Sequence, residues 1–134
     1  NGEYNGMGCH CNFSYESSRS EGGLAKMIEA MELLKQRKKE HVAVYGENND
    51  ERLTGEQEAP SKDDFVYNRA DRSASVRFNN DTVENKKGFF EERRPGSNCD
   101  PYLVGGMLVD TVLLNSKYGD ELVEVYNRTF KKNK

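Results

Sequence analysis

A stripe of apolar side chains over residues 23–40 constrains the fold of this chain more than any other feature of its sequence. Its members recur at spacings of three and four residues, which is the period of one face of an α-helix. They are Leu24, Met27, Ile28, Met31 and Leu34. A basic run, KQRKK at 35–39, follows at the carboxyl end, where the helix dipole favours cations. The sequence therefore predicts an amphipathic helix over about 23–40.

Apolar residues are scarce elsewhere in the chain. Only 34% of the 134 residues are hydrophobic, 32% are charged, and there is no tryptophan. This length allows one ordinary domain at most, and the composition gives that domain a thin core. The chain is therefore interpreted as a piece of a larger protein, with a very polar single domain as the alternative.

Charge, hydropathy and cysteine content exclude several classes of protein. The formal net charge of -3 is unlike that of a nucleic-acid-binding domain, and no apolar run approaches the roughly 20 residues of a membrane span. Cys9 and Cys11 are too close together for a disulfide framework, and the cysteine count of three is odd. The expected compartment is the reducing cytoplasm, although an organellar targeting segment upstream would be invisible in this sequence.

The remaining segments predict a mixture of strands and helices. Residues 46–64 lack an apolar period and read as a long exposed loop. Short β-type runs follow at Ala74–Phe78 and Lys87–Arg93, and Asp100 with Pro101 begins a second helix as N-cap and first helical residue. The last fifteen residues read as a terminal tail. Because strands and helices do not alternate regularly, the predicted class is α+β.

The stretch NGMGCHCN at 5–12 is rich in chemically active side chains. If it is extended, His10 and Asn12 share one face, and the thiols of Cys9 and Cys11 turn to the other, toward the core. One alternative is a surface turn with an incidental histidine. A zinc site that also uses Cys99 and His41 lacks any recognised ligand spacing. A phosphate-binding glycine loop is weak because no Gly-Lys-Ser/Thr follows.

The stretch GFFEERRP at 88–95 repeats this two-sided pattern with charged residues. In a strand, one face carries Phe89, Glu91 and Arg93. The other carries Phe90, Glu92 and Arg94. The Glu91 carboxylate suits a hard cation such as magnesium, and a guanidinium can hold a substrate carboxylate by two parallel hydrogen bonds. The alternative is a solvated ladder of ion pairs.

Three arginines lie close together in NRADRSASVRF, at positions 69, 72 and 77. Phosphoryl transfer requires arginines near a metal-binding carboxylate, because negative charge spreads over the transferred group in the transition state. The alternative is a solvated basic surface.

The order of four motifs resembles the C-terminal part of a eukaryotic-type glutamine synthetase. The motifs are NGMGCHCNFS, RLTGEQEAP, NRADRSASVR and KKGFFEERRPGSNCDP. The resemblance implies that residues 1–115 are the C-terminal portion of the catalytic domain, that 116–134 are a tail, and that the N-terminal domain and the start of the catalytic domain are absent. The implied fold is α+β, with antiparallel strands that form an active-site half-barrel flanked by helices.

The resemblance also implies an activity, which is ATP-dependent ligation of ammonia to L-glutamate through γ-glutamyl phosphate. The expected cofactor is Mg²⁺ or Mn²⁺, with ATP as co-substrate. The expected assembly is a homo-oligomeric ring, a decamer, with active sites shared between subunits and no nucleic-acid or membrane partner. A fragment of this size is expected to be inactive alone. A ligase for another amine and a non-catalytic structural member of the family are the alternatives.

Site residues carry over from the family motifs position by position. Glu58 corresponds to the loop carboxylate that takes a proton from ammonium, and Arg72 to the arginine that stabilises the transferring phosphoryl group. The implied metal ligands are His10 and Glu91. The implied glutamate-binding residues are Asn5, Gly6, Arg52, Arg72 and Arg93. The implied ATP-binding residues are Asn12, Phe13, Ser14, Arg72, Arg77 and Phe89.

Overall fold

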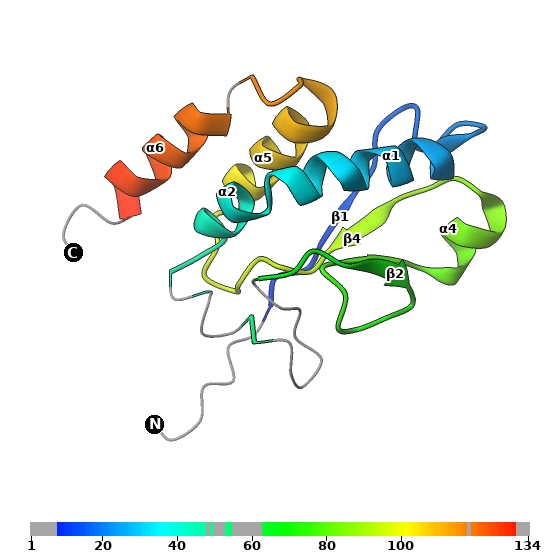
Figure 1. Ribbon diagram of the computed structural model, residues 1–134, viewed down its shortest axis with the longest axis horizontal. Coiled ribbons are helices and arrows are strands. Elements are labelled where there is room, and N and C mark those ends of the chain that lie inside the picture. The colour runs from blue at the N-terminus through cyan, green and yellow to red at the C-terminus, as the bar shows by residue number, and fades with distance from the viewer. Residues whose placement is uncertain (1–7, 48, 50–52, 55–62, 118, 131–134) are drawn as a thin grey trace.

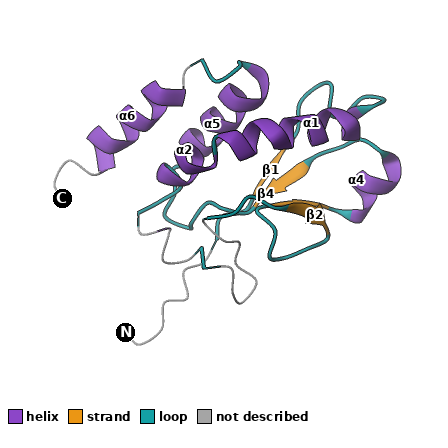
Figure 2. Ribbon diagram, in the orientation of Figure 1, coloured by secondary structure: helices purple, strands orange, loops and turns teal. Residues whose placement is uncertain are grey.

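The computed structural model describes residues 8–47, 49, 53–54, 63–117 and 119–130 (Figures 1 and 2). The elements in chain order are β1 (Cys11–Phe13), α1 (Gly23–Gln36), α2 (Lys38–Ala43), β2 (Tyr67–Arg69), β3 (Val76–Phe78), α4 (Asn80–Asn85), β4 (Phe90–Glu92), α5 (Pro101–Leu113) and α6 (Gly119–Phe130). This mixture confirms the predicted α+β class. None of the helices in the described part of the chain is long and apolar enough to cross a bilayer.

The four strands form one open sheet in the order β1-β4-β3-β2. Strand β4 pairs antiparallel with both β1 and β3, whereas β2 runs parallel to β3. The expectation of antiparallel strands is therefore wrong for the β2–β3 pair. All three residues of β2 are exposed, so no apolar alternation marked this strand in the sequence.

The helices cover one face of the sheet and build the hydrophobic core there (Figure 1). From the sheet, Phe90 lies between Phe13 and Phe78, with ring centroids 5.5 and 6.2 Å away. The helical side chains packed in the same cluster are Met27, Met31 and Leu34 of α1 and Leu103, Val104, Met107 and Leu108 of α5. Burial of these aromatic and aliphatic groups fixes which face of the sheet is turned away from solvent.

The predicted helix over 23–40 is confirmed, with one interruption. It divides at Arg37, whose φ of -115° and ψ of 25° are not helical. The Arg37 guanidinium instead donates to Asp110 of α5 at 3.1 Å, and that carboxylate is almost fully buried. Within the apolar stripe, Met27, Met31 and Leu34 are buried, but Ile28 remains 41% exposed.

A close backbone approach fixes the start of α1. A side chain at Gly23 would place its Cβ only 1.9 Å from the backbone oxygen of Ser18. The preceding Gly22 has a φ of 81°, in the left-handed region that favours glycine. The Gly22–Gly23 pair is thus explained by the conformation of the backbone, without any role in a site.

The C-terminal third contains two helices where the sequence indicated one. Helix α5 begins as predicted, with the Asp100 side chain accepting a hydrogen bond from the backbone N–H of Tyr102. The segment expected to be a tail, 116–134, contains α6. This helix packs against α5 and α2, and its Tyr126 is buried. The helical spacing of Leu122, Val123 and Tyr126 was the available sequence signal.

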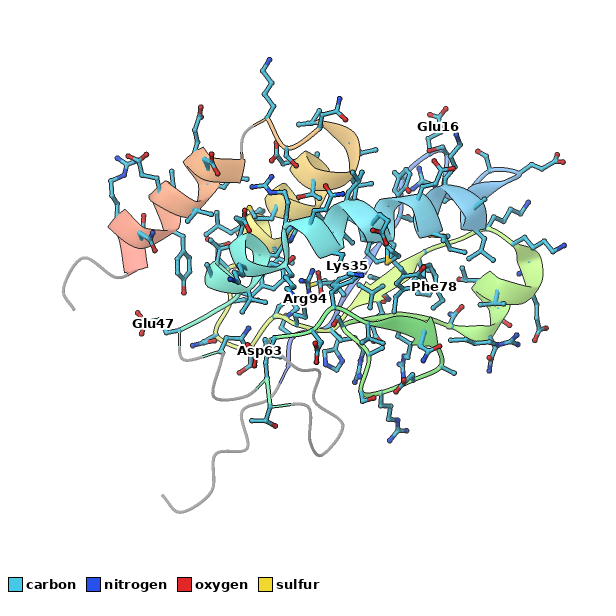
Figure 3. The ribbon with its side chains drawn as sticks, viewed as in Figure 1. Glu16, Lys35, Glu47, Asp63, Phe78 and Arg94 are labelled. Atoms are coloured by element: carbon cyan, nitrogen blue, oxygen red, sulfur yellow. The ribbon has the colours of Figure 1, made fainter. Side chains whose placement is uncertain are left out.

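A buried polar network joins the helices to the sheet. The Glu92 carboxylate accepts two hydrogen bonds from the Arg94 guanidinium, at 2.9 and 2.7 Å, and one from the Tyr45 hydroxyl at 3.1 Å. His41 bridges the Tyr45 hydroxyl at 2.6 Å and the Thr111 hydroxyl at 2.7 Å. Arg94 lies in the interior between the helices and the sheet, as Figure 3 shows. The network connects α2, α5 and β4 without contact with solvent.

This network predicts a pH-dependent stability that depends on His41. Burial, and then the charges of Arg94 and Arg37, hold the pKa of His41 well below its usual 6.5. At a pH between the lowered pKa of His41 in the folded protein and its ordinary pKa in the unfolded chain, only the unfolded chain binds the proton. The free energy of unfolding therefore falls as the pH drops below about 6.5. The slope expected from this one group is at most about 1.4 kcal/mol per pH unit.

Urea unfolding of the full-length protein between neutral and mildly acidic pH measures this slope. His41→Gln keeps a donor and an acceptor but does not titrate there, so its slope should be smaller than that of the wild type. Lys39→Gln, on the exposed side of α2, is the matched control and should retain the wild-type slope. An unchanged slope in His41→Gln would contradict the assignment.

Candidate active site

A row of polar side chains crosses the face of the sheet opposite the core. The strand register pairs Asn12 with Glu91, Glu91 with Arg77, and Arg77 with Asn68. Residues directly opposite each other on paired strands project to the same face. The pairing of these short strands therefore brings residues that are distant in sequence side by side on one face.

The Glu91 carboxylate is the centre of this row. Its Oε1 lies 2.9 Å from Nε of Arg77 and 3.3 Å from Nε of Arg93, and its Oε2 lies 3.7 Å from Nδ1 of His10. The Glu91 side chain is only 18% exposed, so water screens these interactions incompletely. Two guanidinium groups against one carboxylate leave this cluster positively charged, which suits an anionic ligand such as a phosphate.

His10 and Glu91, the two predicted metal ligands, lie close to each other on the polar face. Their nearest donor atoms are 3.7 Å apart. Two donors at about 2.1 Å from one octahedral ion are separated by roughly 3.0 Å when adjacent and 4.2 Å when opposite. An imidazole and a carboxylate are also suitable donors for Mn²⁺, and the carboxylate for Mg²⁺. The observed 3.7 Å lies between these two separations, so a small movement of the side chains would bring both donors to one ion.

Two donors are too few to hold such an ion. Among the described residues, no group of three or more His, Cys, Asp or Glu side chains has a metal-binding arrangement. A complete site needs further oxygen ligands from outside the described residues. Four residues implied by the family resemblance, Asn5, Gly6, Arg52 and Glu58, also lie outside the described residues.

Arg93 shares the face of Glu91 as the alternation predicts, but it is nearly buried, with a side chain 6% exposed. Its backbone N–H donates to the Ser75 carbonyl at 2.9 Å, which ties β4 to the 70–75 loop. Arg72 is exposed on this loop. The 70–75 loop, which carries Arg72, therefore lies beside Arg93.

The neighbouring Asp71 gives this loop its shape. Hydrogen bonds from the Ser73 hydroxyl at 2.7 Å and the Ser73 backbone N–H at 2.8 Å, and a weaker one from Asn68, lower the pKa of the Asp71 carboxyl. The charge of Arg93 adds to the same effect. These hydrogen bonds fix the conformation of the loop that carries Arg72.

A small pocket of about 190 Å³ opens beside Glu91. Its lining consists of Asn12, Arg77, Asn79, Phe89 and Glu91. Four of these five residues were predicted site residues, and the structure brings them together. Asn79 was missed. Its side chain caps α4 by accepting from the Thr82 backbone N–H at 2.8 Å. An N-cap asparagine marks the start of a helix, so the sequence carried no signal for its place in the pocket.

Two predicted ATP-binding residues do not reach this pocket with their side chains. Phe13 lies on the core face, with its ring 5.5 Å from that of Phe90 and 5.8 Å from that of Tyr15. The Ser14 hydroxyl accepts a hydrogen bond from the Arg19 guanidinium at 2.9 Å.

The prediction that the thiols turn away from the polar face is confirmed for Cys11, which pairs with Glu92 and packs against the core. Burial, with Cys9 and Glu92 adding to it, raises the pKa of Cys11 to about 11. The zinc alternative fails, because its histidine, His41, is held by Tyr45 and Thr111 in the buried network.

Comparison with known proteins identifies sequence relatives. No protein-family model matches the chain. A cytosolic glutamine synthetase isozyme of Pinus sylvestris and a chloroplastic glutamine synthetase of Daucus carota are each 49% identical over 113 residues, or 84% of this chain. The cytosolic isozyme 1-1 of Arabidopsis thaliana is 47% identical over the same length. The chain spans about a third of the length of these relatives, from 26% to 32%.

The polar face predicts a specific loss of stability when Glu91 is neutralised. Glu91→Gln removes the carboxylate from the nearly buried Arg93, and breaking such a pair from one side should lower the free energy of unfolding by about 1–3 kcal/mol. Glu84→Gln is the matched control, since Glu84 pairs with Arg69 at 3.1 Å but both side chains are well exposed. The control should change the free energy by less than about 1 kcal/mol. Equal effects of the two substitutions in denaturant titrations would refute the assigned importance of the Glu91 cluster.

Proposed function

We propose that this chain, a homologue of the glutamine synthetases over 84% of its length, forms part of the active site of a glutamate–ammonia ligase. The reaction joins ammonia to L-glutamate at the expense of ATP, through γ-glutamyl phosphate. The observation that carries the proposal is the arrangement around Glu91. There a pair of potential cation ligands, a pocket of about 190 Å³ and two arginines lie together on one face of the sheet.

His10 and Glu91 supply two of the ligands to a divalent cation, Mg²⁺ or Mn²⁺. When bound, the cation neutralises the negative charge of the reacting phosphate oxygens. The 3.7 Å separation of the two donors supports this role. The other ligands come from the part of the polypeptide that corresponds to the remaining two thirds of the relatives.

Asn12, Arg77 and Phe89 form the nucleotide side of the site. Arg77 offers a guanidinium that is 29% exposed, so it can exchange part of its contact with Glu91 for a phosphate oxygen. Phe89 gives the pocket an apolar wall, and Asn12 gives it an amide. Phe13 and Ser14 contribute through their backbone, because their side chains are engaged elsewhere.

Glutamate is held by Asn5, Gly6, Arg52, Arg72 and Arg93. The small exposure of Arg93 supports binding of a carboxylate at the bottom of the site, where a desolvated guanidinium binds most strongly. Glu58 takes the proton released from ammonium. Arg72, on the loop shaped by Asp71, stabilises charge on the phosphoryl group as it is transferred.

The full protein is a homo-oligomeric ring, a decamer, whose active sites are shared between subunits. The described strands form an open four-stranded sheet, which needs further strands to become the expected half-barrel. The relatives include cytosolic and chloroplastic isozymes. For this protein we propose the cytosol, in keeping with its free thiols.

Glutamine formation by the full-length protein tests the proposed function. Purified protein with glutamate, ATP, Mg²⁺ and ammonium should release phosphate and form glutamine in equal amounts. A strong preference for methylamine or a larger amine over ammonium would instead indicate a related γ-glutamyl-amine ligase. No glutamate-dependent phosphate release with any amine would indicate a structural member of the family.

Arg72→Ala tests the proposed transition-state role. Its removal should lower turnover by about 10² to 10³, because the guanidinium stabilises the charge that develops on the phosphoryl group. The KM for glutamate should also rise, because Arg72 belongs to the residues that hold glutamate. Arg69→Ala is the control. That arginine lies at the end of β2 and pairs with Asn80 and Glu84. Turnover by Arg72→Ala equal to that of the Arg69→Ala control would refute the role.

A further inference from the structure

The pocket beside Glu91 has a charged end and a neutral end. Arg77 lies on β3, and the backbone continues extended to Asn79, which has a φ of -78° and a ψ of 167°. Phe89 and Glu91 are likewise two positions apart, and Glu91 pairs with Arg77. Alternate residues of an extended chain share one face and are separated by roughly 6.6 Å. Arg77 and Glu91 thus form one end of the pocket, and Asn79 and Phe89 form the other.

The side-chain amide of Asn79 is only partly engaged. Its Oδ1 accepts the hydrogen bond from the Thr82 backbone N–H, which assigns the oxygen and the nitrogen of the amide. A carbonyl oxygen has two lone pairs, so Oδ1 can accept one more hydrogen bond. None of the described residues accepts a hydrogen bond from its Nδ2 group. The half-buried amide therefore retains one acceptor and two donors for a ligand.

The charges of the pocket decide how a nucleoside triphosphate would lie in it, a step that rests on the proposed function. The phosphates and their cation belong at the end that holds Arg77 and Glu91. The neutral end then receives the nucleoside, and the Phe89 ring offers a flat surface on which a base can stack. The pocket of about 190 Å³ is smaller than the roughly 300 Å³ of a complete small-molecule site, so the described residues form one wall of it.

A side-chain amide at this end would distinguish adenine from guanine. Adenine presents an amino group beside a ring nitrogen, that is, a donor beside an acceptor, and an amide matches this pair with two parallel hydrogen bonds. Guanine presents a carbonyl oxygen beside its ring nitrogen N7, and both are acceptors. The amide oxygen would then face another oxygen, so an amide favours adenine.

We propose that Asn79 is a specificity-determining residue that reads the adenine base of ATP and selects ATP against GTP. Its Nδ2 donates to a ring nitrogen of the base, and its Oδ1 accepts from the amino group. The hydrogen bond from Thr82 to Oδ1 holds the amide in the orientation that this contact needs. Asn79 thus serves both the start of α4 and the choice of nucleotide.

Nucleotide binding by the full-length protein tests this role. Isothermal titration calorimetry with Mg²⁺ present gives the Kd for ATP and for GTP. Asn79→Ser and Asn79→Asp retain a good N-cap, so α4 should form in both, but neither side chain carries an amide. The wild type should bind ATP more tightly than GTP, and in both variants this preference should fall by about 5- to 30-fold. Asn85→Ser, at the exposed last position of α4, is the matched control and should retain the wild-type preference.

Several results would overturn the assignment of Asn79. They are a wild type that binds ATP and GTP equally or binds neither, and an unchanged preference in both variants. Equal weakening of both nucleotides would also overturn it, because a role confined to capping α4 does not depend on the base. Glutamine formation separates this assignment from the proposed function: a protein that selects ATP through Asn79 but forms no glutamine contradicts only the ligase.

Discussion

Strand β4 places two consecutive carboxylates on opposite faces of the sheet, and the rest of the structure is arranged around this alternation. Glu92 points into the core, where Arg94 neutralises it through two hydrogen bonds. Glu91 points to the opposite face, where it meets His10, Arg77 and Arg93. A shift of one residue in the pairing of β4 would exchange these environments and leave each carboxylate without its partners. The strand register is therefore tied both to the integrity of the core and to the chemistry of the site.

The buried ionic network makes this register costly to change. A buried ion pair often adds little net stability compared with apolar packing, but removal of one partner is strongly destabilising. Here the Arg94 guanidinium also lies over the rings of Phe65 and Tyr45, at 4.9 and 5.6 Å. Through Tyr45 and His41 the network extends to Thr111 of α5. A shifted register would bury an unpaired charge beneath two helices, which is why this network specifies one arrangement of the sheet.

Periodic patterns in the sequence predicted those elements whose local signals agree with their tertiary contacts. The stripe from Leu24 to Leu34 gave the first long helix, and Asp100 with Pro101 gave the start of α5. The alternation at 88–95 correctly assigned Glu91 and Arg93 to one face. Strand β2 and the break at Arg37 were missed because no local pattern marks them, whereas the helical spacing in α6 was a local signal that the interpretation as a tail overlooked. At Arg37, for example, the backbone is not helical, and the side chain donates a hydrogen bond to Asp110 of α5.

The sequence by itself determined the family, the α+β class and the two-sided character of β1 and β4, because motifs and alternation are properties of neighbouring residues. Only the tertiary structure decided what each face meets. It placed Asn12, Glu91 and Arg77 in one row and turned the Phe13 side chain away from the pocket. Strand pairing and turn closure join segments separated by tens of residues. Such contacts are selected by burial and hydrogen bonding in the whole fold, and no local pattern encodes them.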